Sequence, residues 1–190
     1  MDLEILGPDA SKLLWSKALL FKIFADIDVF DIEINEKDPD KFIEVVKSIS
    51  TTFGGINLED IKAPEAFKIE KELVDQLDIP VMHDDQHGTA IISSAALLNA
   101  LELVNKKIED VKIVVSGAGA AAIACTKLYI SFGAKLENIV MTDSKGVINN
   151  TRDGLTKEKK FFSTNRKIKT LEEAMVKSDV FIGLSMANIV

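Results

Sequence analysis

The chain has 190 residues, of which 47% are hydrophobic and 28% are charged, and its formal net charge is −7. This composition is that of an ordinary globular protein and excludes a mainly disordered chain. The acidic balance, with no basic block, argues against nucleic acid or an anionic membrane as a partner.

The single cysteine, Cys125, excludes an internal disulfide and a cysteine-based zinc site. Residues 1–12 lack the basic start and apolar run of a signal peptide. No uncharged apolar stretch reaches the roughly 18 residues that predict a membrane-spanning helix. We therefore expect a cytoplasmic protein.

Short β-branched runs alternate with longer amphipathic ones, a pattern typical of α/β layers around a largely parallel sheet. In the first half, the predicted elements are a helix over 10–25, a strand over 29–34, a helix over 39–50, a strand over 54–58, a helix over 64–77 and a strand over 79–82. The polar string HDDQHGT, over 83–89, follows the last strand and is predicted to be a loop.

The second half begins with an Ala- and Leu-rich helix, and its strands are short and continuously apolar, as in a buried parallel sheet. Its predicted elements are helices over 89–104 and 120–132, a strand over 111–116, a strand over 138–142, a polar stretch over 150–169, a helix over 171–177 and a strand over 179–183. We place a domain boundary near residue 87, which gives domains over 1–87 and 88–190.

A glycine-rich turn joins the apolar strand to the next helix. It has the pattern Gly117-x-Gly119-x-x-Ala122, and Ala120 opens the helix. Such glycines allow a tight turn and close approach to a pyrophosphate, which the N–H groups at the helix start can bind. The turn therefore predicts a Rossmann-type, doubly wound dinucleotide domain. A flavin site, an S-adenosylmethionine site and a turn built for packing alone remain alternatives.

Asp143 closes the strand after that helix, somewhat farther along than the roughly 20 positions usual for the ribose-binding acid. Its carboxylate could accept hydrogen bonds from the adenosine ribose, which favours NAD. Ser144 and Lys145 follow directly and could hold a 2′-phosphate, so NADP remains the alternative.

Two acidic pairs, Glu59-Asp60 and Asp84-Asp85, each follow a short predicted strand. The carboxyl ends of parallel strands line the ligand crevice, so the pairs can converge there. Carboxylates without nearby cysteine favour Mg²⁺ or Mn²⁺. The alternative is that these residues only cap the following helices. We interpret His83 and His87 as hydrogen-bonding residues, because the segment is predicted to be a loop; a metal role, which their i and i+4 spacing would allow in a helix, is the alternative.

Three segments, FGGINLEDIKAPEAFKIE, IPVMHDDQHGTAII and VVSGAGAAAIA, closely resemble the bacterial-type malic enzymes and occur in that family's order. With the weaker KALLFKIFADIDVF and DVFIGLS, the resemblance covers nearly the whole chain. It implies oxidation of malate with NAD(P)⁺ and decarboxylation to pyruvate, with Mg²⁺ or Mn²⁺ as the metal.

The resemblance also implies roles for particular residues. Glu59, Asp60 and Asp85 match the metal carboxylates, and Asp84 matches their neighbour in the site. Lys17 matches the general base, which burial and the metal would keep uncharged. The residues that match the cofactor site are Gly117, Gly119, Ala120, Ala122 and Asp143.

The chain departs from the family pattern at several points. Ser16 stands where a glycine commonly precedes the base lysine, and Tyr129 does not match the family's tyrosine acid. That tyrosine lies upstream in the family, and the substrate-holding asparagines lie downstream. We therefore expect the central portion of a malic enzyme, with a sheet truncated at its C-terminal side. The apolar sheet edge this would leave favours a homodimer or higher homo-oligomer.

Two further interpretations compete with a malic enzyme. The first is an amino-acid dehydrogenase on the same scaffold, although such enzymes have no need of two acidic pairs. The second is a non-catalytic fragment or module that keeps the nucleotide and metal positions without turnover.

Overall fold

The computed structural model describes the backbone of residues 8–186 and the side chains of residues 17–186. The chain divides into two compact units, one ending at Thr52 and the other beginning at Phe53. The start of the N-terminal stretch examined for a signal peptide, residues 1–7, lies outside the described residues. Within the part of the chain that is described, no helix has both the length and the apolar character to cross a bilayer.

The first unit contains helices α1 (Pro8–Ala25) and α2 (Pro39–Ser50), both close to their predicted bounds. The Asp38 side chain caps α2 by accepting hydrogen bonds from the N–H groups of Asp40, at 2.9 Å, and Lys41, at 3.3 Å. A proline at the first helical position suits this start, because its missing N–H would have no helical partner there.

The strand predicted over 29–34 is wrong, because the segment between α1 and α2 has no regular structure. Val29 and Phe30 are 42% and 72% exposed. β-Branched residues favour a strand only where a neighbouring strand and a buried face receive them. Among the described residues, no strand pairs with this segment.

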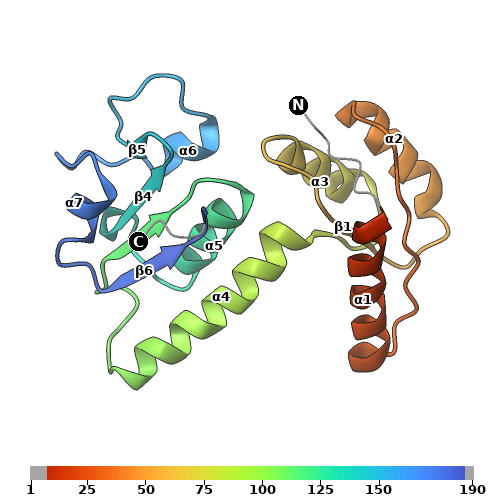
Figure 1. The fold of residues 1–190 in the computed structure, drawn as a ribbon, viewed down its shortest axis with the longest axis horizontal. Coiled ribbons are helices and arrows are strands. Elements are labelled where there is room, and N and C mark those ends of the chain that lie inside the picture. The colour runs from red at the N-terminus through yellow and green to blue at the C-terminus, as the bar shows by residue number, and fades with distance from the viewer. Residues whose placement is uncertain (1–7, 187–190) are drawn as a thin grey trace. The chain divides into compact units, whose positions relative to one another are not determined.

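The second unit begins with a β-α-β arrangement. Strands β1 (Ile56–Leu58) and β2 (Val81–His83) pair in parallel, and α3 (Glu65–Gln76) connects them. Helix α3 buries Ala66, Ile69 and Leu73, whose spacing places them on one face. Figure 1 shows α3 and the short strand β1 of this arrangement.

Helix α4 (Asp84–Leu103) begins directly after β2, so the predicted loop over 83–89 is wrong. Acidic residues in the first turn suit the positive end of the helix dipole. Gly88 lies inside the helix, where a Cβ would fall only 2.3 Å from Oδ1 of Asp84. The glycine therefore makes room for the Asp84 carboxylate. The domain boundary near residue 87 stays a prediction.

A four-stranded sheet forms the rest of the second unit, in the order β5-β4-β3-β6. Strands β3 (Ile113–Ser116), β4 (Ile139–Asp143) and β6 (Val180–Gly183) are parallel, as predicted. The short β5 (Gly146–Val147) was not predicted and pairs with β4 in antiparallel fashion. Because β4 and β6 flank β3 on opposite sides, the chain reverses its direction of winding at β3. In doubly wound sheets, ligands bind at such a reversal.

Both faces of this sheet are covered, which explains the continuous apolar strands. Ile113, Val115 and Met141 point into a core with α4 and α5 (Ala120–Ser131), while Val114 and Val140 pack on the other face near α7 (Leu171–Met175). Figure 1 shows α5 and α7 beside the strands. The remaining short helices are η1 (Leu136–Asn138) and α6 (Lys157–Phe161). The mixed α/β fold with parallel sheets is thus confirmed.

Candidate functional site

The two acidic pairs follow neighbouring parallel strands at the same edge. Leu58 of β1 lies opposite His83 of β2 in the strand register, so Glu59-Asp60 and Asp84-Asp85 continue from matched positions. Asp60 has a left-handed backbone, with φ of 55°. The side chains of Asp60 and Asp85 are exposed. The main chain therefore brings the two pairs to one edge of the β1–β2 sheet.

The side chains at this edge do not gather into a cation site. Glu59 accepts a hydrogen bond of 2.8 Å from the Asn57 amide, and the Asp84 carboxylate lies over Gly88. Nowhere in residues 17–186 do three carboxylate, imidazole or thiol groups come close enough together to hold a metal ion. The oxygen donors suit Mg²⁺ or Mn²⁺ chemically. The role of Glu59, Asp60 and Asp85 as metal ligands stays a prediction.

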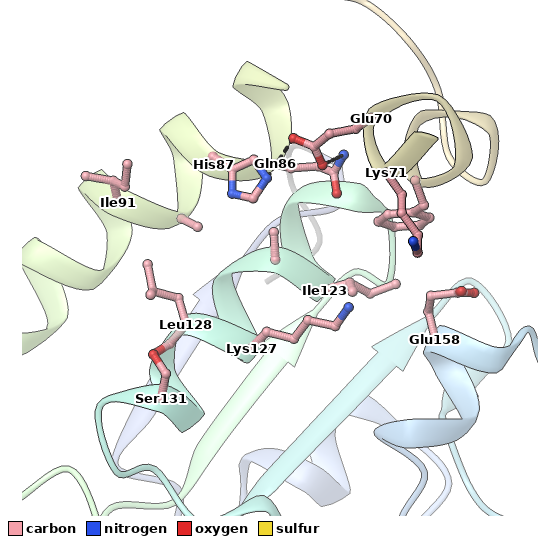
Figure 2. A pocket seen from close by; sticks show the side chains of 13 residues that line it. Glu70, Lys71, Gln86, His87, Ile91, Ile123, Lys127, Leu128, Ser131 and Glu158 are labelled. Carbon is pink, nitrogen blue, oxygen red and sulfur yellow. Dashed lines mark hydrogen bonds and ion pairs between the residues drawn. The ribbon is translucent and has the colours of Figure 1, made fainter. Parts of the chain in front are cut away.

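Glu70, on α3, holds the start of α4 and was missed in the sequence. Its Oε1 accepts a hydrogen bond from the His83 backbone N–H, at 2.9 Å, and lies 2.8 Å from His87 Nε2. Its Oε2 accepts a 3.0 Å bond from the Gln86 amide. Figure 2 shows the Glu70 carboxylate beside Gln86 and His87. The carboxylate thus fixes the turn that carries Asp84 and Asp85.

Both histidines have polar contacts within the second unit. His83 is fully buried, and its Nε2 lies 3.2 Å from the backbone oxygen of Ile61. Among the side chains that the structure describes, its Nδ1 is buried without a hydrogen-bond partner. His87 is half-exposed and pairs with Glu70.

A cavity of about 590 Å³ opens beside Glu70, between α3, α4 and α5 (Figure 2). Its charged lining residues include Lys71, Lys127 and Glu158, and its apolar ones include Phe67 and Ile123. No residue predicted from the sequence to bind a nucleotide or a metal lines this described cavity.

The glycine turn lies between β3 and α5, as predicted, and its two glycines serve different purposes. Gly117 has φ of +122°, and a Cβ there would lie 2.2 Å from the Leu184 backbone oxygen. Its N–H donates to the Thr142 oxygen at 3.0 Å. Packing within the chain therefore requires this glycine.

Gly119 is the N-cap of α5, and a Cβ there would meet no atom of the described residues within 4 Å. No side chain caps the helix, and Ala120 is its first residue. The N–H groups at the helix start are therefore available to an anion. Ala122 is fully buried in the core, where its small side chain lets α5 pack closely on β3.

Asp143 closes β4 beside the glycine turn, but its carboxylate already has several donors. Arg152 binds both oxygens, at 3.0 Å each, and Lys159 Nζ lies 3.0 Å from Oδ2. The Lys145 backbone N–H donates to Oδ1 at 2.9 Å. Burial would raise the pKa of Asp143, but the hydrogen bonds from Arg152, Lys145 and Lys159 outweigh it and lower the pKa to about 2. Arg152 and Lys159 lie in the polar stretch over 150–169, where no motif points to them.

Lys17, the predicted general base, lies on α1 of the first unit and is partly exposed. The other predicted site residues all belong to the second unit. The role of Lys17 therefore stays a prediction.

Comparisons with known proteins cover both units. The family model described as "Malic enzyme, N-terminal domain" matches residues 5–74. The one described as "Malic enzyme, NAD binding domain" matches residues 86–190, which is more than half of the chain.

Curated relatives agree with these matches. The NADP-dependent malic enzyme of Escherichia coli (strain K12) is 57% identical over 171 residues, or 89% of this chain and 22% of that protein. The NAD-dependent malic enzyme of Rhizobium meliloti (strain 1021) is 50% identical over 191 residues, or 100% of this chain and 25% of that protein. The chain spans about a quarter to a half of the length of the curated relatives it matches.

The fold matches as well as the sequence does. The crystal structure of the NAD-dependent malic enzyme from Thermotoga maritima superposes with a TM-score of 0.90 at 43% identity, covering 100% of this chain and 52% of that one. The resemblance seen in the sequence is confirmed, and the chain belongs to the malic enzyme family.

Proposed function

We propose that this chain contributes to an NAD(P)-dependent malic enzyme, which oxidises malate and decarboxylates the product to pyruvate. The observation that carries the proposal is the start of α5. An uncapped helix begins there after a glycine whose Cβ position is open space. A pyrophosphate can approach such a backbone closely and accept hydrogen bonds from its N–H groups.

Family membership supports roles for the other predicted residues. Gly117, Gly119, Ala120 and Ala122 form the nucleotide turn. When bound, the nicotinamide cofactor supplies the hydride acceptor and a divalent cation supplies a Lewis acid.

The edge of the β1–β2 sheet that carries Glu59-Asp60 and Asp84-Asp85, called the acidic edge below, and the first unit have separate roles. Glu59, Asp60 and Asp85 are the proposed ligands of the cation, with Asp84 as their neighbour in the site. Lys17 is the proposed general base, which accepts the proton of the malate hydroxyl at its Nζ. We also propose that the chain works in the cytoplasm as a homodimer or higher homo-oligomer.

Nucleotide binding is tested on the purified chain by calorimetric titration with NAD⁺ and with NADP⁺. Gly119→Val adds a branched side chain where the nucleotide backbone would lie. We expect this variant to lose at least about tenfold in affinity while it still unfolds cooperatively, with a melting temperature lowered only by the weaker N-cap. Gly54→Val is the matched control, since a Cβ at Gly54 also meets nothing within 4 Å. Equal affinities in both variants would overturn the nucleotide site.

Cation binding is tested separately, by paramagnetic resonance of Mn²⁺. We expect saturable binding that is lost in the double variant Asp60→Asn/Asp85→Asn. The control, Asp78→Asn/Asp110→Asn, removes the same charge from two exposed positions elsewhere. Equal binding in both double variants would mean that the acidic edge is not a metal site in this chain.

A second candidate function follows from the finding that, among residues 17–186, no three carboxylate, imidazole or thiol groups lie close enough together to hold a metal ion. It is a module that binds the nucleotide but has no turnover by itself. Assays of malate with NAD⁺ and NADP⁺ distinguish the two functions. Turnover that Lys17→Ala abolishes excludes the module. Nucleotide binding without turnover supports it.

The amino-acid-dehydrogenase alternative receives no support, because both family models that match are those of malic enzymes.

A further inference from the structure

The cavity between α3, α4 and α5 is separate from the residues proposed for the nucleotide, the cation and the base. Its volume is about 590 Å³, within the roughly 300–1,000 Å³ of sites for small ligands, which combine an apolar lining with a few polar groups. Apolar side chains from all three helices form its floor: Phe67, Ala90, Ile91, Ile123, Ala124 and Leu128. Ala90 and Ile123 belong to the buried core, so they fix the floor in place.

Most charged groups of the cavity wall already have partners. Glu70 accepts a hydrogen bond from the Gln86 amide and pairs with His87. Lys71 pairs with Asp75, one turn farther along α3. A ligand could use these charges only by breaking existing contacts, so we assign them to the wall and not to ligand binding.

Two charged side chains of the cavity remain for a ligand. They are Lys127, which is exposed on α5, and Glu158, which is partly exposed on α6. Among residues 17–186, no side chain or backbone group forms a hydrogen bond or ion pair with either side chain. Figure 2 shows Lys127 extending toward the side of the cavity where Glu158 lies. A bound group of opposite charge can therefore pair with each of them without displacing a partner.

These two opposite charges select the chemical class of the ligand. A simple anion would face Glu158, and a simple amine would face Lys127. An uncharged apolar molecule would remove water from both charges and pair with neither. A zwitterion satisfies both, because its carboxylate accepts hydrogen bonds from Lys127 and its ammonium donates to Glu158. The apolar floor adds affinity for a large apolar side chain.

We propose that this cavity binds an α-amino acid with a large apolar side chain. Its carboxylate pairs with Lys127 and its ammonium with Glu158, while its side chain packs over Phe67 and Ile123. The ligand then contacts α3, α5 and α6 at once, and α4 forms the remaining wall.

The site also reaches the start of α4. Gln86 and His87 line the cavity and belong to the first turns of α4, which begin with Asp84 and Asp85. A ligand that binds only the folded arrangement of this wall stabilises it against local opening. An effect on cation binding at Asp84 and Asp85 rests on the proposed function, whereas the amino-acid site does not.

The first test is calorimetric titration of the purified chain with phenylalanine and three analogues. Glycine lacks the apolar side chain, phenylpropionate lacks the ammonium, and phenylethylamine lacks the carboxylate. Each analogue should bind at least about tenfold more weakly than phenylalanine. An analogue that binds as tightly as phenylalanine overturns the proposal, as does the absence of saturable binding up to about 10 mM phenylalanine.

Two variants assign the charges. Lys127→Gln should weaken phenylalanine binding about fivefold without weakening phenylethylamine binding, and Glu158→Gln should weaken it about fivefold without weakening phenylpropionate binding. The controls are Lys135→Gln and Glu109→Gln, which remove the same charges from exposed positions outside the cavity. If both cavity variants bind phenylalanine as tightly as their controls do, the assignment of the cavity is wrong.

Hydrogen exchange read by mass spectrometry tests the link to α4. Phenylalanine at about ten times its dissociation constant should slow exchange in peptides over 81–90 by up to about tenfold, while peptides from α2 stay unchanged. Unchanged exchange over 81–90 overturns the link to α4. None of these readouts requires turnover, a cation or a nucleotide, so a failure of the proposed function leaves them intact and is distinguishable from a failure of this site.

Discussion

Glu70 is the side chain whose removal should most specifically loosen the turn that carries Asp84 and Asp85. In Glu70→Ala, the His83 backbone N–H and the Gln86 amide lose their acceptor. His83 is fully buried and Gln86 is 5% exposed, so water replaces that acceptor poorly. Each unsatisfied donor costs about 1–3 kcal/mol. The His87 contact adds little, because that side chain is half-exposed.

We therefore expect Glu70→Ala to destabilise the start of α4 by about 3 kcal/mol. Such a loss should speed local amide hydrogen exchange by roughly a hundredfold. The assay is hydrogen exchange read by mass spectrometry on peptides over 81–90, with peptides from α2 as an internal reference. The reference distinguishes local opening at α4 from unfolding of the whole chain.

Glu102→Gln is the matched control, because Glu102 is an exposed acid near the other end of the same helix. The free energy of unfolding of Glu102→Gln should differ from that of the unmodified chain by less than about 0.5 kcal/mol. Glu70→Gln keeps one acceptor oxygen and should fall between the two. The reasoning is refuted if peptides over 81–90 exchange at the same rate in Glu70→Ala and in the control.

Three further predictions concern stability. Tyr129 is the chain's only tyrosine and is fully buried. Burial raises the pKa of Tyr129 to about 12, although its hydrogen bond with Ser93 acts in the opposite direction. The absorbance of the tyrosinate should therefore appear near pH 12 rather than near pH 10. The stability it contributes is complete below about pH 10 and is lost as pH rises through about 12. Asp143 has its pKa lowered to about 2, so its contribution is complete above about pH 4 and is lost as pH falls through about 2. Asp143→Asn should lower the free energy of unfolding at pH 7 by about 2 kcal/mol, which urea titration measures. Leu73 is fully buried, so Leu73→Ala should cost about 2–5 kcal/mol in the same titration.

Elements that carry their own local signals were predictable from the sequence. Asp38-Pro39 fixes the start of α2, because its cap and its first helical residue are adjacent in the chain. Strands β3 and β4 were recognisable from their apolar runs, since both faces of the sheet are covered. Such features depend on a few residues that are adjacent in the chain, so a sequence pattern can predict them.

Elements that depend on distant partners were not predictable. Val29–Ile34 has the residues of a strand, but no described strand pairs with it. The start of α4 was hidden by Gly88, whose cost in a helix is offset by the space it leaves for Asp84. β5 has only two residues and exists through its pairing with β4.

The candidate site also contains features that the sequence predicts and features that it does not. The glycine turn and the acidic pairs are continuous in the sequence and were located correctly at strand ends. Glu70 and Lys159 act across 13 to 16 positions of the chain, on His83, Gln86 and Asp143. No periodic pattern links such residues, because the fold alone brings their side chains together.

The two glycines of the turn show why a motif by itself is a weak argument for a ligand. At Gly117 the chain requires a glycine for its own packing, because the Leu184 oxygen occupies the position of a side chain. Any protein with this strand arrangement would need that glycine, whether or not it binds a nucleotide. At Gly119 the chain imposes no such demand: the backbone is in an ordinary region and the space is open. Since no described residue fills that space, a side chain at Gly119 would obstruct a bound group and not the described chain, so the case for a nucleotide depends on the second glycine far more than on the first.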